Sequence, residues 1–334
     1  MPNNTRNNTS CRRASSACIE FSVALWAITA CAQPYPAKPV RIIVPIAPGG
    51  GQDLVARMIG QKLTLALGQP AVIDNRPGAG GIIGTNLAAK SPPDGYTLVL
   101  VAASFTAQPS LYAKLPYDPL RDLVPITQLG GQPYLLVVNR AVPAKTVKDL
   151  IVLAKSGKDR VSYGSTGNGE ISYLAMEFLK TLAGFDALHV PYKGAAPALT
   201  ALLSGEVDTF FPSITSGLPH IRSGKVRALA VTTLKRAALL PDLPTVAESG
   251  FPTYEVSGWY GLLAPAGTPD EIVAKIQQET AKILETQDVR EMQAANGRTP
   301  TPGGNTPQEF ATNIRAEISR WSKVIRQTKA QLEE

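Results

Sequence analysis

Beyond residue 35, short apolar runs alternate with stretches whose apolar residues recur at helical spacing. The first run, residues 40–46, is rich in β-branched residues and predicts a buried strand. A helix is expected next, with Asp53 as its N-cap and Gly68 at its end. The expected strands of this region are 40–46, 71–74 and 96–102, and the expected helices are 54–67 and 82–90. This alternation of strand and helix predicts a parallel sheet in an α/β protein.

A second series of the same kind begins near Pro143. Its expected helices are 146–155, 171–182 and 195–203, and its expected strands are 161–164, 189–192, 207–211 and 226–232. Residues 254–263 are expected to be extended, and amphipathic helices are expected at 270–285 and 306–325. These two C-terminal helices have no sheet of their own. We therefore expect them to pack on the first sheet, which makes a discontinuous domain.

The composition is typical of a folded protein that is soluble in water. Of the 334 residues, 44% are hydrophobic and 18% are charged, which excludes a wholly disordered chain. No uninterrupted apolar run reaches the length of a membrane span, which excludes a protein with many spans. The length suggests two domains.

The first 32 residues have the features of an export signal. A polar start with paired arginines precedes the apolar stretch 21–30, which is too short to span a bilayer but suits the core of a signal peptide. Small residues around Cys31 predict cleavage after Ala32, which leaves Gln33 first and the mature protein in the periplasm.

Two alternatives to this cleavage remain open. Residues 28–31 also fit a lipobox, in which Cys31 would carry the lipid, and a buried N-terminal helix is a third interpretation. Cleavage after Ala32 would remove all three cysteines, Cys11, Cys18 and Cys31. The mature protein would then have no disulfide, thiolate nucleophile or Cys-ligated zinc.

The first candidate site is the glycine-rich turn between the first strand and its helix. Glycines let backbone N–H groups approach a ligand, and a helix N-terminus favours an anion. The turn also follows the carboxyl end of a strand, where open α/β sheets bind ligands. No P-loop lysine follows, so nucleotide phosphate is not expected; a tight structural turn is the alternative. The candidate ligand-binding residues here are Pro48, Gly49, Gly50, Gly51, Gln52 and Asp53.

The second candidate is the glycine-rich turn after the strand 161–164, where hydroxyls of Ser165 and Thr166 would join free backbone N–H groups around a carboxylate. His189 follows Ser165 by 24 residues, so a secreted serine hydrolase of small esters, using Ser165 and His189, is the alternative function. No Gly-x-Ser-x-Gly motif supports it. The candidate residues of this turn are Ser165, Thr166, Gly167, Asn168 and Gly169.

Three further side chains lie near predicted strand ends. Ser104 and Thr106 follow the strand 96–102 and are expected to point into the same site. Asp208 would orient donors or bind an amine there, or would cap a strand end instead. The glycines at 78–84 have the wrong spacing for a dinucleotide fingerprint, and His189 and His220 form no metal motif. We therefore expect no cofactor, no metal and no catalytic set.

Many ordered segments together resemble the Bug family, the periplasmic solute receptors of tripartite tricarboxylate transporters (TctC-like). The matching segments are 39–45, 47–53, 56–57, 75–81, 93–98, 191–194, 203–208, 240–250 and 264–269. The resemblance covers the chain from about Tyr35 to the C-terminus. Its specificity comes from the order of these segments more than from any one glycine turn.

The resemblance implies a two-lobed α/β periplasmic binding protein (type II-like) that closes on a small organic acid. The implied lobes are 33–137 plus 256–334 and 138–255, with crossing strands 134–139 and 254–262 as the hinge. Residues 47–53 and 165–169 would hold the ligand. Tyr173 departs from the family, which often has His there, and it joins the candidate ligand-binding residues.

The resemblance also implies a receptor and not an enzyme. Its partners would be the ligand and the transporter's membrane subunits, with no nucleic acid, and the protein would be a monomer. A receptor that signals to a sensor remains the alternative.

Overall fold

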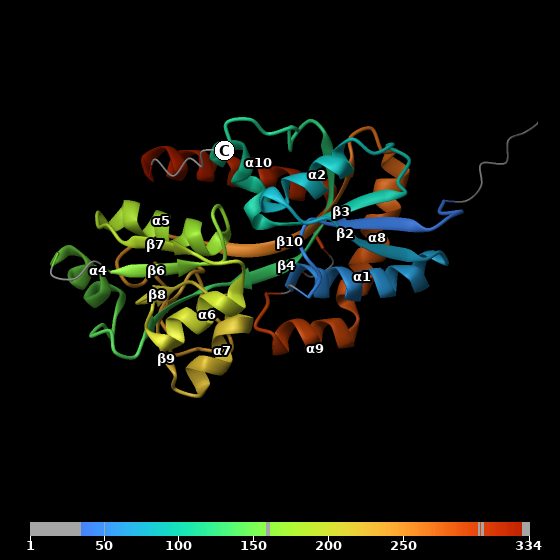
Figure 1. Ribbon diagram of the computed structural model, residues 1–334. Coiled ribbons are helices and arrows are strands. Elements are labelled where there is room, and N and C mark those ends of the chain that lie inside the picture. The colour runs from blue at the N-terminus through green and yellow to red at the C-terminus, as the bar shows by residue number, and fades with distance from the viewer. Residues whose placement is uncertain (1–34, 50, 158–160, 300, 302–303, 329–334) are drawn as a thin grey trace, which may run out of the picture. The chain divides into compact units, whose positions relative to one another are not determined.

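The computed structural model describes residues 35–49, 51–157, 161–299, 301 and 304–328 (Figure 1). The predicted export signal, residues 1–32, lies outside this part. The described strands form two five-stranded sheets. The first, in the order β2-β1-β3-β10-β4, consists of β2 (Ala71–Asn75), β1 (Val40–Val44), β3 (Thr97–Ala102), β10 (Ser257–Pro265) and β4 (Leu123–Pro133). The second, in the order β7-β6-β8-β5-β9, consists of β7 (Leu188–Pro191), β6 (Ser162–Ser165), β8 (Thr209–Phe210), β5 (Leu135–Asn139) and β9 (Val226–Val231).

Both sheets mix strand directions. In the first sheet β1 runs parallel to β2 and β3, while β10 is antiparallel to β3 and β4. In the second sheet β6 runs parallel to β7 and β8, while β5 is antiparallel to β8 and β9. The parallel strands come from the predicted strand–helix series, because parallel neighbours need a crossover connection. The predicted α/β class is confirmed.

Helices cover both faces of the first sheet. Helices α1 (Gly51–Leu67) and α8 (Asp270–Glu285) pack on one face, where Ile42 of β1 meets Ile59 and Ile276 in one buried cluster. Helices α2 (Ile82–Ala89) and α10 (Pro307–Thr328) cover the other face, where the neighbouring Ile43 shares a cluster with Phe310. Successive strand residues point to opposite faces, which explains this division. The prediction that the C-terminal helices pack on the first sheet is confirmed.

The second sheet is covered in the same way. Helices α4 (Val147–Lys155) and α5 (Ile171–Ala183) pack on one face, and α6 (Ala195–Ser204) and α7 (Ile214–Arg222) on the other (Figure 1). Helix α10 also contacts α5, so it touches elements of both sheets. The remaining helices are α3 (Gln108–Leu111), α9 (Gln287–Ala295) and the short 3-10 turns η1 (Ala79–Gly81) and η2 (Ala103–Thr106). No described helix has the length and apolar character that a membrane crossing requires.

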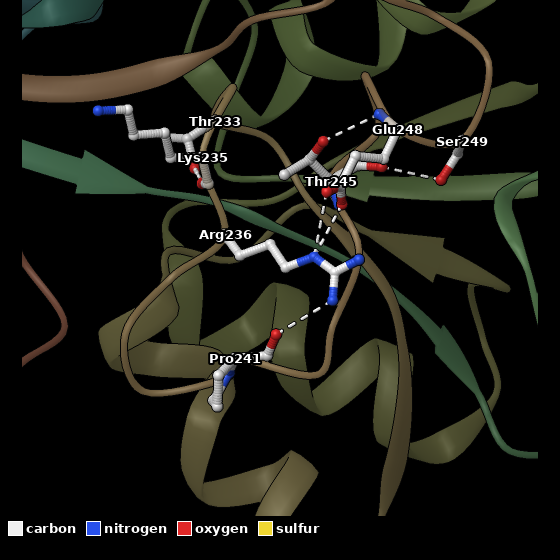
Figure 2. Close-up of polar contacts among 7 residues, drawn as sticks. All are labelled: Thr233, Lys235, Arg236, Pro241, Thr245, Glu248 and Ser249. Carbon is white, nitrogen blue, oxygen red and sulfur yellow. Dashed lines mark hydrogen bonds and ion pairs between the residues drawn. The ribbon is translucent and has the colours of Figure 1, made fainter.

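Within the segment between β9 and β10, Arg236 makes contacts that connect separate parts of the segment (Figure 2). The guanidinium Nε lies 2.9 Å from Glu248 Oε2, and the same group donates a hydrogen bond to the carbonyl of Pro241. The Thr245 amide also donates to Glu248, and these hydrogen bonds hold the pKa of Glu248 below its usual range. The fixed segment connects the second sheet back to the first.

The chain passes between the sheets at two neighbouring places. Tyr134 separates β4 from β5, and Val256 precedes β10. Thr232 joins the two crossings, because its amide donates to the Tyr134 carbonyl at 3.0 Å and its carbonyl accepts from the Val256 amide at 2.9 Å. The lobe boundaries 33–137 plus 256–334 and 138–255 stay a prediction. The chain passes from the first sheet to the second at Tyr134, and it has returned to the first sheet at Ser257.

Several local differences separate the structure from the sequence expectations, and helices α3 and α9 were among the elements not predicted. Strand β4 was not predicted, because Gly130 and Gly131 interrupt its apolar pattern. Helix α7 was also not predicted, since it contains Pro219. Asp53 is not an N-cap: α1 already includes Gly51, and Asp53 lies in its first turn.

Candidate ligand-binding cleft

Two adjoining cavities are each lined by residues from segments associated with both sheets. Their volumes are about 380 and 390 Å³, the size of a small-molecule site. Both are lined by Gly51, Gln132, Tyr134, Thr166 and Tyr260. We call the joined space the cleft. Its first part, the Arg298 arm, also contains Ser213, Thr215, Asn296 and Arg298, and its second, the Glu170 arm, also contains Pro48, Gln52, Glu170, Lys193 and Trp259.

Four helices begin at the cleft. Helix α1 starts with Gly51, α5 follows Glu170, α6 follows Gly194, and α7 starts beside Ser213; these residues all line the cleft. Each of these helices follows a strand that runs parallel to a neighbouring strand. The start of each helix therefore lies at one end of a sheet. Helix N-termini carry partial positive charge and unpaired N–H groups, which together favour an anion.

The first predicted turn places three residues in the cleft. Gly51 and Gln52 line it together with Pro48, and Gln52 Nε2 donates to the Leu100 carbonyl at 2.6 Å, which fixes the turn against β3. A side chain at Gly51 would disturb Tyr260, because a Cβ there would lie 2.9 Å from Tyr260 Oη. Gly50 lies outside the described residues, and Gly49 does not line either cavity.

Asp53 is turned away from the cleft, contrary to expectation. Its carboxylate accepts hydrogen bonds at 2.9 Å each from the Gly49 amide, Arg57 Nε and Asn75 Nδ2. Burial alone would raise the pKa of Asp53, but these hydrogen bonds hold it below its usual value. The residue stabilises the turn that carries Gly51 and does not contact the cavities.

The second predicted turn contributes only Thr166. The expected free amides are absent at two positions: the Thr166 amide donates to Ser172 Oγ at 2.9 Å, and the Gly167 amide donates to Ser165 Oγ at 3.2 Å. Ser165 is fully buried. Gly167, Asn168 and Gly169 line neither cavity. The prediction that this turn surrounds a carboxylate with its own amides is therefore wrong at these positions, because the turn satisfies them internally.

Ser165 and His189 are close together but lack access. Ser165 Oγ lies 2.7 Å from His189 Nε2, and the imidazole lies between the rings of Tyr163 and Tyr173 at centroid distances of 4.8 and 4.7 Å. Burial, with Lys180 nearby, lowers the pKa of His189 to about 4. Within the described residues no carboxylate is hydrogen-bonded to His189, and Ser165 faces no cavity. The pair fixes the turn, and Tyr173 packs on the pair, not in the cleft.

The three remaining predicted residues lie in different places. Ser104 lines a pocket of about 20 Å³ behind the Glu170 arm. Thr106 is fully buried and donates to the Ala103 carbonyl, with Glu317 also in reach, so its predicted place in the cleft is wrong. Asp208 accepts from the amide and hydroxyl of Ser162 at 2.8 Å each, which is the strand-end cap considered as its alternative.

Several cleft residues were not predicted from the sequence. Arg298 is partly buried, its guanidinium lies 5.6 Å from the Tyr260 ring centre, and its Nε has no hydrogen-bond partner in the described part of the chain. Burial lowers the pKa of Arg298. A partly buried cation without an acidic partner among the described residues favours an anionic ligand beside it. Its position after α9 carried no sequence signal, whereas Glu170, directly ahead of a predicted helix, could have been singled out.

Metal binding has no support in the described residues, since no three His, Cys, Asp or Glu side chains gather there as ligands. The chemistry that the cleft offers is hydrogen bonding and charge: hydroxyls, amides, four helix N-termini and the side chains of Arg298, Glu170 and Lys193. This arrangement suits a small anion held without a covalent step.

Comparison with known proteins agrees with this geometry. Residues 55–330 match the family described as tripartite tricarboxylate transporter family receptor. Protein BugT of Bordetella pertussis is 38% identical over 90% of this chain and 92% of its own length.

Three solved structures are similar to this chain. A Rhodopseudomonas palustris protein with adipate has a TM-score of 0.80 at 36% identity, over 88% of this chain and 98% of its own. The periplasmic binding protein BugD has a TM-score of 0.79 at 34% identity, over 90% of this chain and 100% of its own. MatC of Rhodopseudomonas palustris, with bound malate, has a TM-score of 0.79 at 36% identity, over 87% of this chain and 100% of its own. These matches confirm the two-lobed periplasmic binding fold, and the chain belongs to the Bug family of tripartite tricarboxylate transporter receptors.

Proposed function

We propose that this protein captures a small organic acid in the cleft and passes it to the membrane subunits of a tripartite tricarboxylate transporter. The observation that carries the proposal is the convergence of four helix N-termini and Arg298 on one cavity. Adipate and malate, which occupy two related structures, are both carboxylates. The proposed ligand contacts are Pro48, Gly51, Gln52, Thr166 and Arg298.

The proposed movement is closure of the two lobes about the crossings at Tyr134 and Val256. Thr232 joins these crossings through backbone hydrogen bonds, so small dihedral changes there would move one sheet relative to the other. Ligand contacts from both sheets, such as Gly51 and Thr166, would stabilise the closed form. A receptor of this kind releases its ligand unchanged, without catalysis.

The proposed location is the periplasm, after cleavage of the export signal at Ala32. Mass spectrometry of the exported protein should give Gln33 as its first residue. A diacylated Cys31 would contradict the cleavage site and support a lipid-anchored receptor.

Binding is tested by a thermal-shift screen of mono-, di- and tricarboxylates, followed by titration calorimetry. A ligand present at 100 times its Kd should add about 2.7 kcal/mol to the free energy of unfolding. Mass spectrometry after long incubation should recover the acid unchanged. Stabilisation by no carboxylate, or appearance of a reaction product, would contradict the proposal. Uptake by cells that carry the membrane subunits separates transport from signalling to a sensor.

A further inference from the structure

The Glu170 arm of the cleft contains an acidic side chain that the turn does not use. Glu170 is the N-cap residue of α5, a position where Asp, Asn, Ser and Thr commonly cap the helix, and its side chain makes no capping hydrogen bond. Its side chain instead lines the 390 Å³ cavity and the small pocket behind it. Ser104, from the η2 turn that follows β3, lines the same small pocket as Glu170. The carboxyl group is thus positioned at the inner wall of the ligand site.

No cation of the described residues compensates this carboxyl group. Lys193 lines the same cavity, but its side chain is exposed and the ion pairs of the described residues do not include Glu170. The negative charge of Glu170 contributes to raising the pKa of three tyrosine hydroxyls, those of Tyr112, Tyr134 and Tyr260. Burial raises the pKa of Glu170 to about 7, and the nearby Ser104 hydroxyl acts in the opposite direction.

The two arms of the cleft therefore differ in sign. The Arg298 arm offers a cation without an acidic partner among the described residues, and it suits a carboxylate. The Glu170 arm offers acceptor oxygens, and a second ligand carboxylate placed there would face a like charge. A hydrogen-bond donor on the ligand would be attracted instead.

We propose that Glu170 determines specificity, and that the preferred ligand carries one carboxylate and, at its other end, a donor such as an ammonium or primary amide group. This inference rests on the proposed function of the cleft and names the chemical class of its ligand. The carboxylate binds at the Arg298 arm, and the donor binds at Glu170. A symmetric dicarboxylate is disfavoured because one of its ends must meet Glu170.

Titration calorimetry with matched ligands tests the inference. One set consists of adipate, adipamate and 6-aminohexanoate, and a shorter set consists of succinate, succinamate and 4-aminobutyrate. The buffer is held at about pH 8, where Glu170 is mostly ionised. The wild-type protein should bind a donor-bearing member of one set at least about tenfold more tightly than the matching dicarboxylate. The variant Glu170→Gln should reverse this order, because it removes the negative charge at nearly constant size.

Two variants control for general effects. Lys323→Gln changes an exposed charged group on α10, outside both cavities, and should leave the ranking of ligands unchanged. Glu170→Asp keeps the charge and should keep the wild-type ranking. Circular dichroism and thermal melts establish that Glu170→Gln is folded, which is expected because Glu170 has no ion-pair partner to lose among the described residues.

The possible failures are distinguishable. If wild type binds the dicarboxylate as tightly as its donor-bearing partners, or if Glu170→Gln leaves the ranking unchanged, the inference is overturned while the proposed function stands. If no member of either set binds, and the wider carboxylate screen also finds none, the proposed function fails and this inference fails with it.

Discussion

The turns after β1 and after β6 have similar sequences but different relations to the cleft. Both are rich in glycine, and both connect a strand to a helix that begins at the cavity. The first turn places Pro48, Gly51 and Gln52 on the cavity surface. In the second turn Ser165 is bonded to His189 below the surface, and only Thr166 reaches the cavity. Hydrogen-bond partners elsewhere in the fold decide which groups of a glycine-rich turn remain free for a ligand.

The largest expected effect comes from adding a side chain to the first turn. Gly51→Val would place a Cβ only 2.9 Å from Tyr260 Oη, so the tyrosine or the turn must shift, and both residues line both cavities. We expect Kd to rise about 100-fold, measured by titration calorimetry. Gly51→Ala combined with Tyr260→Phe, which lacks the contacting oxygen, should bind more tightly than Gly51→Ala alone. Unchanged affinity of Gly51→Val would remove the first turn from the site.

The second turn is tested at Thr166, the residue of that turn that lines the cleft. Thr166→Ala removes a hydroxyl that lies 2.9 Å from Ser172 Oγ and that we propose also contacts the ligand. Loss of a ligand hydrogen bond of about 1–3 kcal/mol would raise Kd about 5- to 150-fold. Thr200→Ala is the matched control, since Thr200 is an exposed threonine of the same lobe on α6 and lines neither cavity. Equal Kd values for Thr166→Ala and wild type would leave the second turn without a role in binding.

Ser165 should behave differently from its neighbour. Ser165→Ala leaves His189 Nε2 and the Gly167 amide without their partner in a buried place. We expect a loss of about 1–3 kcal/mol in the free energy of unfolding, measured by urea denaturation, with Kd changed by less than about threefold. Thr166→Ala should raise Kd more than Ser165→Ala does, although it also removes the hydroxyl contact with Ser172. A large rise in Kd without a loss of stability would instead put Ser165 in contact with the ligand.

Much of this fold was predictable because its apolar periodicity is regular. Helix α5 and strand β1 have clear patterns, and both were expected within a few residues of their bounds. Strand β4 was not expected, since its central glycines weaken the pattern although its pairing with β10 holds it in the sheet. The residue pattern within a strand does not show which strand it pairs with. For a strand with a weak pattern, this pairing decides whether the strand forms.

The site residues that could be predicted from the sequence are those that directly follow a predicted strand. Gly51 and Thr166 follow predicted strands, and that position led to both. Arg298 and Tyr260 come from distant segments that reach the cleft through packing of the last helices and of β10. Thr106 follows a strand end too, but its hydroxyl finds the Ala103 carbonyl and turns inward.

The smallest effect is expected far from both turns. Lys323 is exposed on α10, and Lys323→Ala should leave Kd within about twofold and the free energy of unfolding within about 0.5 kcal/mol. Calorimetry and denaturation on the same preparation measure both. A larger change in Kd would mean that binding responds to general charge, and would weaken the comparison of the two turns.

A crystal structure of the protein with the acid that binds most tightly tests the central claim most directly. The account predicts that the acid lies in the cleft, with a carboxylate at the Arg298 arm and with contacts to both Gly51 and Thr166. An acid bound outside the cleft, or held by one sheet's residues alone, would contradict it.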